Sequence, residues 1–102
     1  MKFMIAYHGG DTPESKEAGM EHMKRWKEWV SGLGDKVINP GTPLPQSFLI
    51  RSDSVEQDSN PDAMKGFAII EAADFDEATE IAKSDPFLNM NGTIRLSQMM
   101  EM

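Results

Sequence analysis

Two strand–helix–strand units follow each other in this chain of 102 residues, and their order limits the folds open to it. The segments with strand-like alternation or composition are Lys2–Tyr7, Asp35–Asn39, Lys65–Glu71 and Gly92–Met100. The segments with helical spacing of apolar residues are Glu17–Leu33 and Asp74–Lys83. Two such units in so short a chain predict the ferredoxin-like α+β fold, βαββαβ, with both helices on one face of an antiparallel sheet.

Each predicted helix carries signals for its ends and for one apolar face. Thr12 or Ser15 is placed to cap the first helix, and two glycines follow its last turn. Asp74 with Glu77 three residues later is a variant of the capping box that begins the second helix. The side chains that we expect to be buried are Met23, Trp26, Trp29, Val30 and Leu33 on the first helix, and Phe75, Ala78, Ile81 and Ala82 on the second.

The segment between the two units is irregular. Three prolines in residues 40–45 exclude a regular helix or a central strand there. Ser47–Arg51 has the composition of a short strand, and the polar stretch Ser52–Asp62 is typical of a loop or a hairpin tip.

The length, charge and composition of the chain limit the molecules that it can bind. The length fits one domain over residues 1–102, and a second copy is the simplest cover for the sheet face that the helices leave open, so we expect a homodimer. A net charge of −7 argues against nucleic acid and anionic membranes, which select clustered positive charge. The chain has no cysteine, no signal-peptide pattern and no apolar run of about 18 residues. A soluble cytoplasmic protein is therefore the default expectation.

One histidine lies on the apolar side of the first predicted helix. At 100° per residue, His22 falls in line with Trp26, Trp29 and Leu33. A histidine titrates near pH ~6.5 when free, so desolvating it is costly unless a polar group pairs with it. The segment Ser84-Asp85-Pro86-Phe87 offers a carboxylate for this purpose.

Four segments in this order resemble the YCII-related family of small proteins, within the dimeric α+β-barrel superfamily. They are the opening strand Met1–Tyr7, the histidine segment Glu21–Trp26, the turn Asn39–Leu44, and the segment Ala82–Phe87 followed by Gly92–Met102. The resemblance covers nearly the whole chain and implies a dimeric α+β barrel.

The resemblance also implies a catalytic pair, His22 and Asp85, because the helical histidine and the aspartate before proline are proposed to act together in this family. A carboxylate can hold an imidazole in one tautomer, and the imidazole can then move a proton at neutral pH. The reaction class would be that of lactone isomerases or dehydrochlorinases of aromatic breakdown, acting on a small organic molecule. The alternatives are a structural pair in which Asp85 satisfies a half-buried histidine, and a non-catalytic ligand-binding or structural dimer.

Three further residues are candidates for contact with a ligand. His8 follows the first strand beside two glycines and is either at the mouth of a pocket or in a simple turn. Tyr7 can donate a hydrogen bond there, and Trp26 can either stack on a substrate or pack in the core or dimer interface. The spacing of the histidines and the absence of a glycine-rich phosphate loop predict no metal site and no cofactor.

Overall fold

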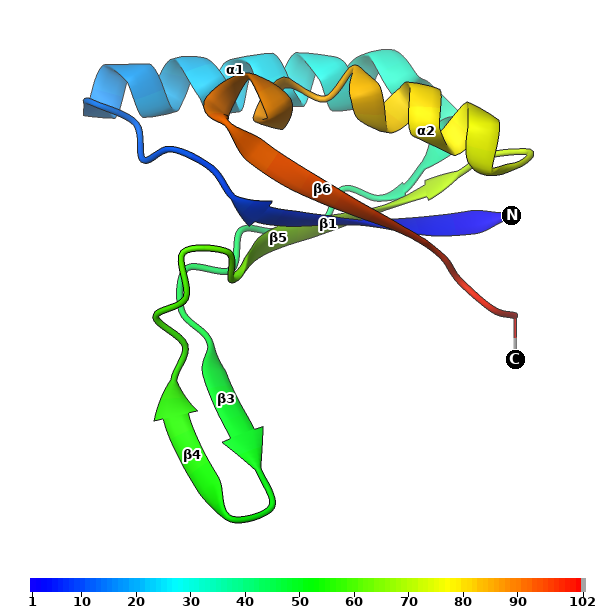
Figure 1. Cartoon of the computed structure of the whole chain (residues 1–102). Helices are drawn as coiled ribbons and strands as arrows, with labels where there is room; N and C mark the ends of the chain where they lie inside the picture. Colours follow the sequence, from blue (N-terminus) through cyan, green and yellow to red (C-terminus); the bar gives the residue numbers. More distant parts are fainter. Residues whose placement is uncertain (102) are drawn as a thin grey trace.

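The computed structural model describes residues 1–101 and contains an antiparallel four-stranded sheet with two helices on one face (Figure 1). The sheet order is β2-β5-β1-β6, so the two long strands β1 and β5 lie in the centre. This is the predicted ferredoxin-like βαββαβ arrangement, with a hairpin inserted between its second and third strands. The elements are β1 Lys2–Gly9, α1 Lys16–Leu33, the 3₁₀ turn η1 Gly34–Lys36, β2 Val37–Asn39, β3 Phe48–Arg51, β4 Ser54–Gln57, β5 Met64–Glu71, α2 Phe75–Lys83, the 3₁₀ turn η2 Pro86–Met90 and β6 Gly92–Gln98.

The core lies between the sheet and the helices. Phe3, Ile5 and Tyr7 alternate along β1 and are buried on the helix-facing side, as the period of two in a strand requires. They pair with Ile70, Ala68 and Gly66 of β5 in register, and Leu96 and Ile94 of β6 complete the layer.

Helix α2 buries three of the four residues that were predicted, Ala78, Ile81 and Ala82. The expectation that Phe75 is buried is wrong, because this residue is in the first turn, at the end of the core. Its ring meets Phe3 edge-on at a centroid distance of 4.9 Å and is otherwise exposed. The predicted cap is confirmed, since the Asp74 side chain accepts a hydrogen bond from the Glu77 N–H at 2.8 Å.

Helix α1 begins at the predicted cap Ser15, whose Oγ accepts from the Ala18 N–H at 3.1 Å. Its tryptophans, Val30 and Leu33 are half-buried, and no residue of the helix is fully buried. The expectation that Met23 is buried is wrong. Met23 lies on a flank of α1 that borders a cavity, so less protein packs against it.

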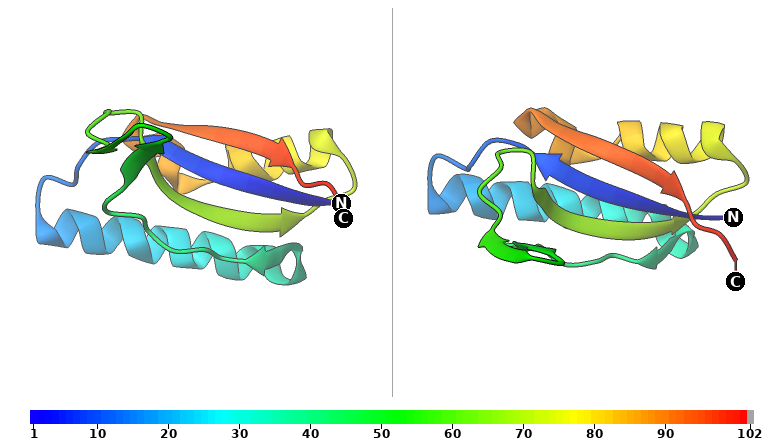
Figure 2. Two further views of the ribbon diagram at one scale, coloured as in Figure 1. Left: turned by 90° about the horizontal axis from the view of Figure 1, so that it is seen from below. Right: turned by 60° about the horizontal axis from the view of Figure 1, so that its bottom comes forward.

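The residues between β2 and β5 form an arm. β3 and β4 pair only with each other within the described chain, and Figure 1 shows this hairpin projecting from the sheet on the side opposite the helices. The two views of Figure 2 agree with this placement. Ser52–Asp62 was expected to be a loop or a hairpin tip. Only its first two residues form the tip, and the strand β4 in this stretch was not predicted.

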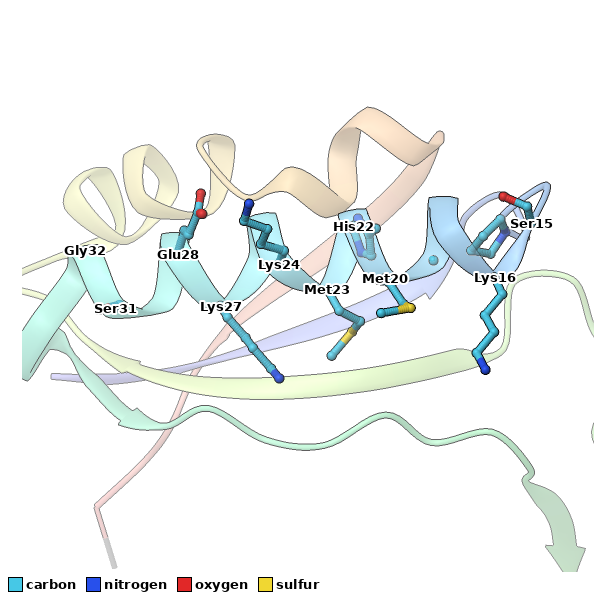
Figure 3. A pocket seen from close by; sticks show the side chains of 12 residues that line it. Ser15, Lys16, Met20, His22, Met23, Lys24, Lys27, Glu28, Ser31 and Gly32 are labelled. Carbon is cyan, nitrogen blue, oxygen red and sulfur yellow. The ribbon is translucent and has the colours of Figure 1, made fainter.

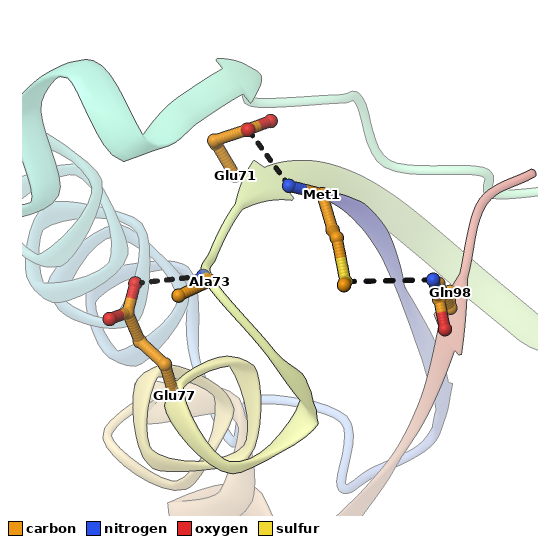
Figure 4. A network of polar contacts seen from close by, with 5 residues as sticks. All are labelled: Met1, Glu71, Ala73, Glu77 and Gln98. Atoms are coloured by element: carbon orange, nitrogen blue, oxygen red, sulfur yellow. Dashed lines mark hydrogen bonds and ion pairs between the residues drawn. The ribbon is translucent and has the colours of Figure 1, made fainter. Parts of the chain in front are cut away.

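Met1 is held at one end of the sheet by contacts with β5 and β6. The Met1 ammonium contacts Glu71 Oε1 at 2.9 Å, and Gln98 Nε2 donates to the Met1 sulfur at 3.6 Å (Figure 4). The same view shows Glu77 accepting from the Ala73 N–H, which fixes the start of α2 next to this end of the sheet. Among residues 1–101, no helix combines the length and hydropathy needed to cross a bilayer, and the cytoplasmic location expected from the sequence stays a prediction.

Candidate active site

The segment after α2 places one carboxylate in the interior. Asp85 caps the 3₁₀ turn η2: its Oδ1 accepts from the Phe87 N–H at 2.9 Å, and Pro86 occupies the first position of the turn. Only 2 % of Asp85 is exposed, and it is the one charged residue in the buried set of the described chain. A carboxylate so deeply placed needs partners for both oxygens.

Tyr7 supplies the second partner. Its hydroxyl donates to Asp85 Oδ2 at 2.5 Å and accepts a hydrogen bond from Trp26 Nε1 at 3.3 Å. Phe87, two residues after Asp85, packs its ring edge-on against the Tyr7 ring at a centroid distance of 5.0 Å. These hydrogen bonds and the ring contact connect residues of β1, α1 and η2. No buried side-chain N or O atom in residues 1–101 lacks a hydrogen-bond partner.

His22 lies one helical turn before Trp26 and is half-buried beside the same group. The sequence predicted that Asp85 pairs with His22 directly. In residues 1–101 the side-chain partner of the carboxylate is Tyr7, and no hydrogen bond joins His22 to Asp85. The two residues interact through charge, because a positive charge on His22 lowers the pKa of the Asp85 carboxyl.

Burial dominates the electrostatics of the pair. Desolvation raises the pKa of Asp85 above its ordinary value of 3.8, and the Tyr7 hydroxyl, the Phe87 N–H and His22 lower it without cancelling that effect. Desolvation, followed by the charge of Asp85 and the hydrogen bond to it, raises the pKa of Tyr7 far above its ordinary value. Tyr7 is therefore a neutral hydroxyl at physiological pH.

A cavity of about 320 Å³ opens between α1, β5 and the proline-rich segment. Its volume is at the lower end of the range for small-molecule sites, which suits a molecule with a single ring. The lining is mostly apolar and aromatic, and His22 and Lys65 are its positively ionisable members. The lining residues are Tyr7, Pro13, His22, Met23, Trp26, Pro40, Thr42, Pro43, Lys65, Gly66, Phe67, Phe87 and Met90.

A second hollow runs along the surface of α1 (Figure 3). Its lining residues all come from positions 13–32, so one helix and the turn before it supply every wall. Figure 3 shows Met20, Met23 and Lys27 projecting to the same side of the helix. With no opposing element, this hollow is a surface groove. Pro13, His22 and Met23 are shared between it and the cavity beside Tyr7.

Of the three residues predicted to contact a ligand, two lie at the cavity and one lies elsewhere. Tyr7 and Trp26 line the cavity, whereas His8 does not belong to the lining. His8 lies where the pairing of β1 with β5 shifts register, and its Nδ1 is 2.9 Å from the Asp62 carbonyl oxygen, which can only accept. No group of three or more His, Asp or Glu side chains in the described residues is placed to hold a metal ion.

Sequence reasoning missed the wall formed by the proline-rich segment. Asn39 Oδ1 accepts from the Gly41 N–H at 2.8 Å, and Pro43 forms an isolated bridge with Gly66 of β5. The segment therefore runs beside β5 and faces α1 across the cavity. The Asn39-Pro40-Gly41 turn was visible in the sequence, but its docking on β5 is a long-range contact that local patterns do not encode.

The family model of the YCII-related domain matches residues 1–102. The chain belongs to the YCII-related domain family. The family resemblance inferred from the sequence is thus confirmed. A search among curated proteins finds no match.

A solved structure shares the fold of this YCII-related protein. It is 5-chloro-2-hydroxyhydroquinone dehydrochlorinase from Burkholderia phenoliruptrix AC1100, in complex with 2,5-dihydroxybenzoquinone. The two chains superpose with a TM-score of 0.61 at 19% sequence identity, over 100% of this chain and 96% of the other. The match confirms the α+β fold predicted from the sequence.

Proposed function

We propose that this YCII-related protein is a small acid–base enzyme that isomerises a small organic molecule or eliminates a leaving group from it. The observation that carries the proposal is a buried carboxylate, Asp85, hydrogen-bonded to Tyr7 in the wall of a ring-sized apolar cavity that His22 also lines. Titratable groups with displaced pKa values in an apolar cavity are typical of sites that move protons.

His22 is the proposed base. In an elimination it would take a proton from carbon, the C–H electron pair would form the new double bond, and the leaving group would depart with its own pair. While Asp85 is ionised, its negative charge would favour the imidazolium that this step creates, because the two groups attract each other. Tyr7 and Trp26 would hold and cover the substrate.

The fold neighbour supports a ring compound as substrate. That enzyme is named for dehydrochlorination and was solved with a single-ring quinone, and the cavity of about 320 Å³ in this protein suits one ring. Substituted hydroquinones and other small hydroxylated or chlorinated rings are therefore the compounds to assay first.

Replacing His22 with alanine is expected to lower turnover by about 10²- to 10⁴-fold, the usual contribution of a positioned general base. Wild type would be screened for chloride release and for exchange of substrate C–H hydrogen with deuterium. Arg25→Gln is the matched control, because Arg25 is on the same helix and is exposed beside Glu21. Turnover that survives His22→Ala would refute the role of His22, and binding without turnover would favour a non-catalytic binding module.

We also propose that the protein acts as a homodimer. The face of the sheet away from the helices carries the half-buried side chains of Met4, Phe67 and Ile69, which the register of β1 and β5 places close together. The hairpin projects on that same side (Figure 1). Phe48, Ile50 and Val55 lie on one face of the hairpin. Ile50 is 76% exposed and Val55 is 67% exposed. Adjacent apolar surfaces of this kind mark an interface, and a second copy on the open face would cover both.

Ile50→Lys is expected to weaken the dimer about tenfold or more, because it places a charge in the apolar face of the hairpin. Leu49→Lys is the control, since Leu49 is on the same strand but points to the face that carries the Arg51–Glu56 ion pair. Sedimentation equilibrium would give both association constants. A monomeric wild type, or equal effects of the two substitutions, would contradict the proposed interface.

A further inference from the structure

The hydrogen bonds of Tyr7 leave its hydroxyl proton committed to Asp85. A phenolic hydroxyl has one proton to donate and two lone pairs to accept with. In the structure the proton goes to Asp85 Oδ2 and one lone pair accepts from Trp26 Nε1. The ring of Tyr7 lines the cavity, so a bound molecule would meet a hydroxyl whose proton is already used.

Protonation of Asp85 reverses this bond. A carboxylic acid can donate its own proton from Oδ2 to the Tyr7 oxygen, on the lone pair that Trp26 leaves free. The Tyr7 proton is then released to point into the cavity. In that state every donor and acceptor is still satisfied: Asp85 donates to Tyr7, Trp26 donates to Tyr7, and Tyr7 donates to the ligand.

We propose that the Tyr7 hydroxyl binds the anionic oxygen of a ring-sized ligand and does so only when Asp85 has taken up a proton, so that ligand binding and proton uptake are one event. This inference rests on the proposed function, because it uses the same cavity. The ligand class is a small aromatic phenolate or enolate. Asp85 is then a positioning residue that acts through Tyr7, and the hydroxyl is the group that touches the ligand.

The surroundings favour an anion at this point. The ionisable groups that face the cavity beside Tyr7 are His22 from α1 and Lys65 from β5, both of which carry positive charge when protonated. The proline-rich segment contributes uncharged residues. The buried Asp85 caps η2 and is hydrogen-bonded to Tyr7. An ionised Asp85 would repel a bound anion across Tyr7, and its neutralisation removes that repulsion.

The test is calorimetric titration with 4-nitrophenol at a pH above its own pKa, in two buffers with different ionisation enthalpies. Wild type is expected to take up about one proton for each phenolate bound. The methyl ether 4-nitroanisole has no anionic oxygen and is expected to bind without proton uptake. Tyr7→Phe is expected to bind the phenolate about ten- to a hundredfold more weakly and without uptake.

Two further variants test whether the proton is taken up by Asp85 or by another group. Asp85→Asn keeps a donor toward Tyr7, so it is expected to retain phenolate binding and lose the proton uptake. His22→Gln is expected to retain the uptake, whereas a proton taken by His22 would disappear in this variant. Three results would each overturn the proposed coupling of Tyr7 and Asp85. They are phenolate binding without proton uptake in wild type, proton uptake that persists in Asp85→Asn, and no binding of the phenolate. The acid–base proposal stands or falls separately, on the turnover of His22→Ala.

Discussion

Gly41→Ala is expected to destabilise the protein by about 3 kcal/mol and to remove one wall of the cavity. Gly41 has a φ of 75°, in the left-handed region that costs a side-chain-bearing residue about 1–3 kcal/mol. A Cβ at this position would lie 1.7 Å from the carbonyl oxygen of Phe67, which is backbone of β5 and cannot rotate away. Relief of this overlap requires the segment to leave β5, and overpacking of this kind adds about 1–3 kcal/mol.

Two other glycines serve as controls that separate the cost of the positive φ from the cost of the overlap with Phe67. Gly34 also has a positive φ, 57°, but an added Cβ meets nothing within 4 Å, so Gly34→Ala is expected to show only the backbone cost. Gly32 is in α1 with equally open space, so Gly32→Ala is expected to stabilise by about 0.5–1 kcal/mol. Urea denaturation of the three variants gives the comparison. Equal losses for Gly41→Ala and Gly34→Ala would show that the contact with Phe67 is not tight.

The main sheet was predictable because its strands carry local signals. Alternation in Lys2–Tyr7 and Lys65–Glu71 gave the two central strands to within two residues at each end, since a half-buried strand repeats every two residues. The order of the elements then selected the fold. Burial on the helices was harder to predict, because Met23 and Phe75 satisfy the helical period but lie at edges where nothing packs over them.

Most of the residues proposed for the site lie close together, but His8 lies outside the cavity lining, and the hydrogen bonds within the site were not predictable. Tyr7, His22, Trp26 and Asp85 do gather at one place, from segments as far apart as β1 and η2. No local pattern indicates whether the carboxylate would bond to the histidine or to the tyrosine. That choice depends on where Tyr7 points from β1 and on how η2 turns after Pro86, which are tertiary features.

Asp85→Ala is expected to destabilise the protein by about 2–4 kcal/mol at neutral pH. The substitution removes the cap of η2, worth about 1 kcal/mol, and leaves the Phe87 N–H and the Tyr7 hydroxyl without their acceptor. A buried polar group that loses its partner costs about 1–3 kcal/mol. Urea denaturation, followed by circular dichroism, would measure the loss.

Asp85→Asn is the matched variant, and its effect has the opposite sign at neutral pH. The amide oxygen can still accept from the Phe87 N–H, and the amide nitrogen can donate to the Tyr7 oxygen. The charge that burial disfavours is removed. Asp85→Asn is therefore expected to be more stable than wild type at neutral pH, and a loss as large as that of Asp85→Ala would show that the site requires the negative charge.

The stability difference between Asp85→Asn and wild type is expected to depend on pH. Because the pKa of Asp85 is raised in the folded state, the folded protein binds more protons than the unfolded chain between pH 3.8 and that raised value. Wild-type stability contributed by this group therefore falls as the pH rises through that window and is level above it. The advantage of Asp85→Asn should grow over the same window and should vanish below pH 3.8, where both side chains are neutral. A difference that is constant with pH would mean that Asp85 ionises as readily in the folded protein as in water. Asp85 would then lack the raised pKa that favours its protonation when a phenolate binds.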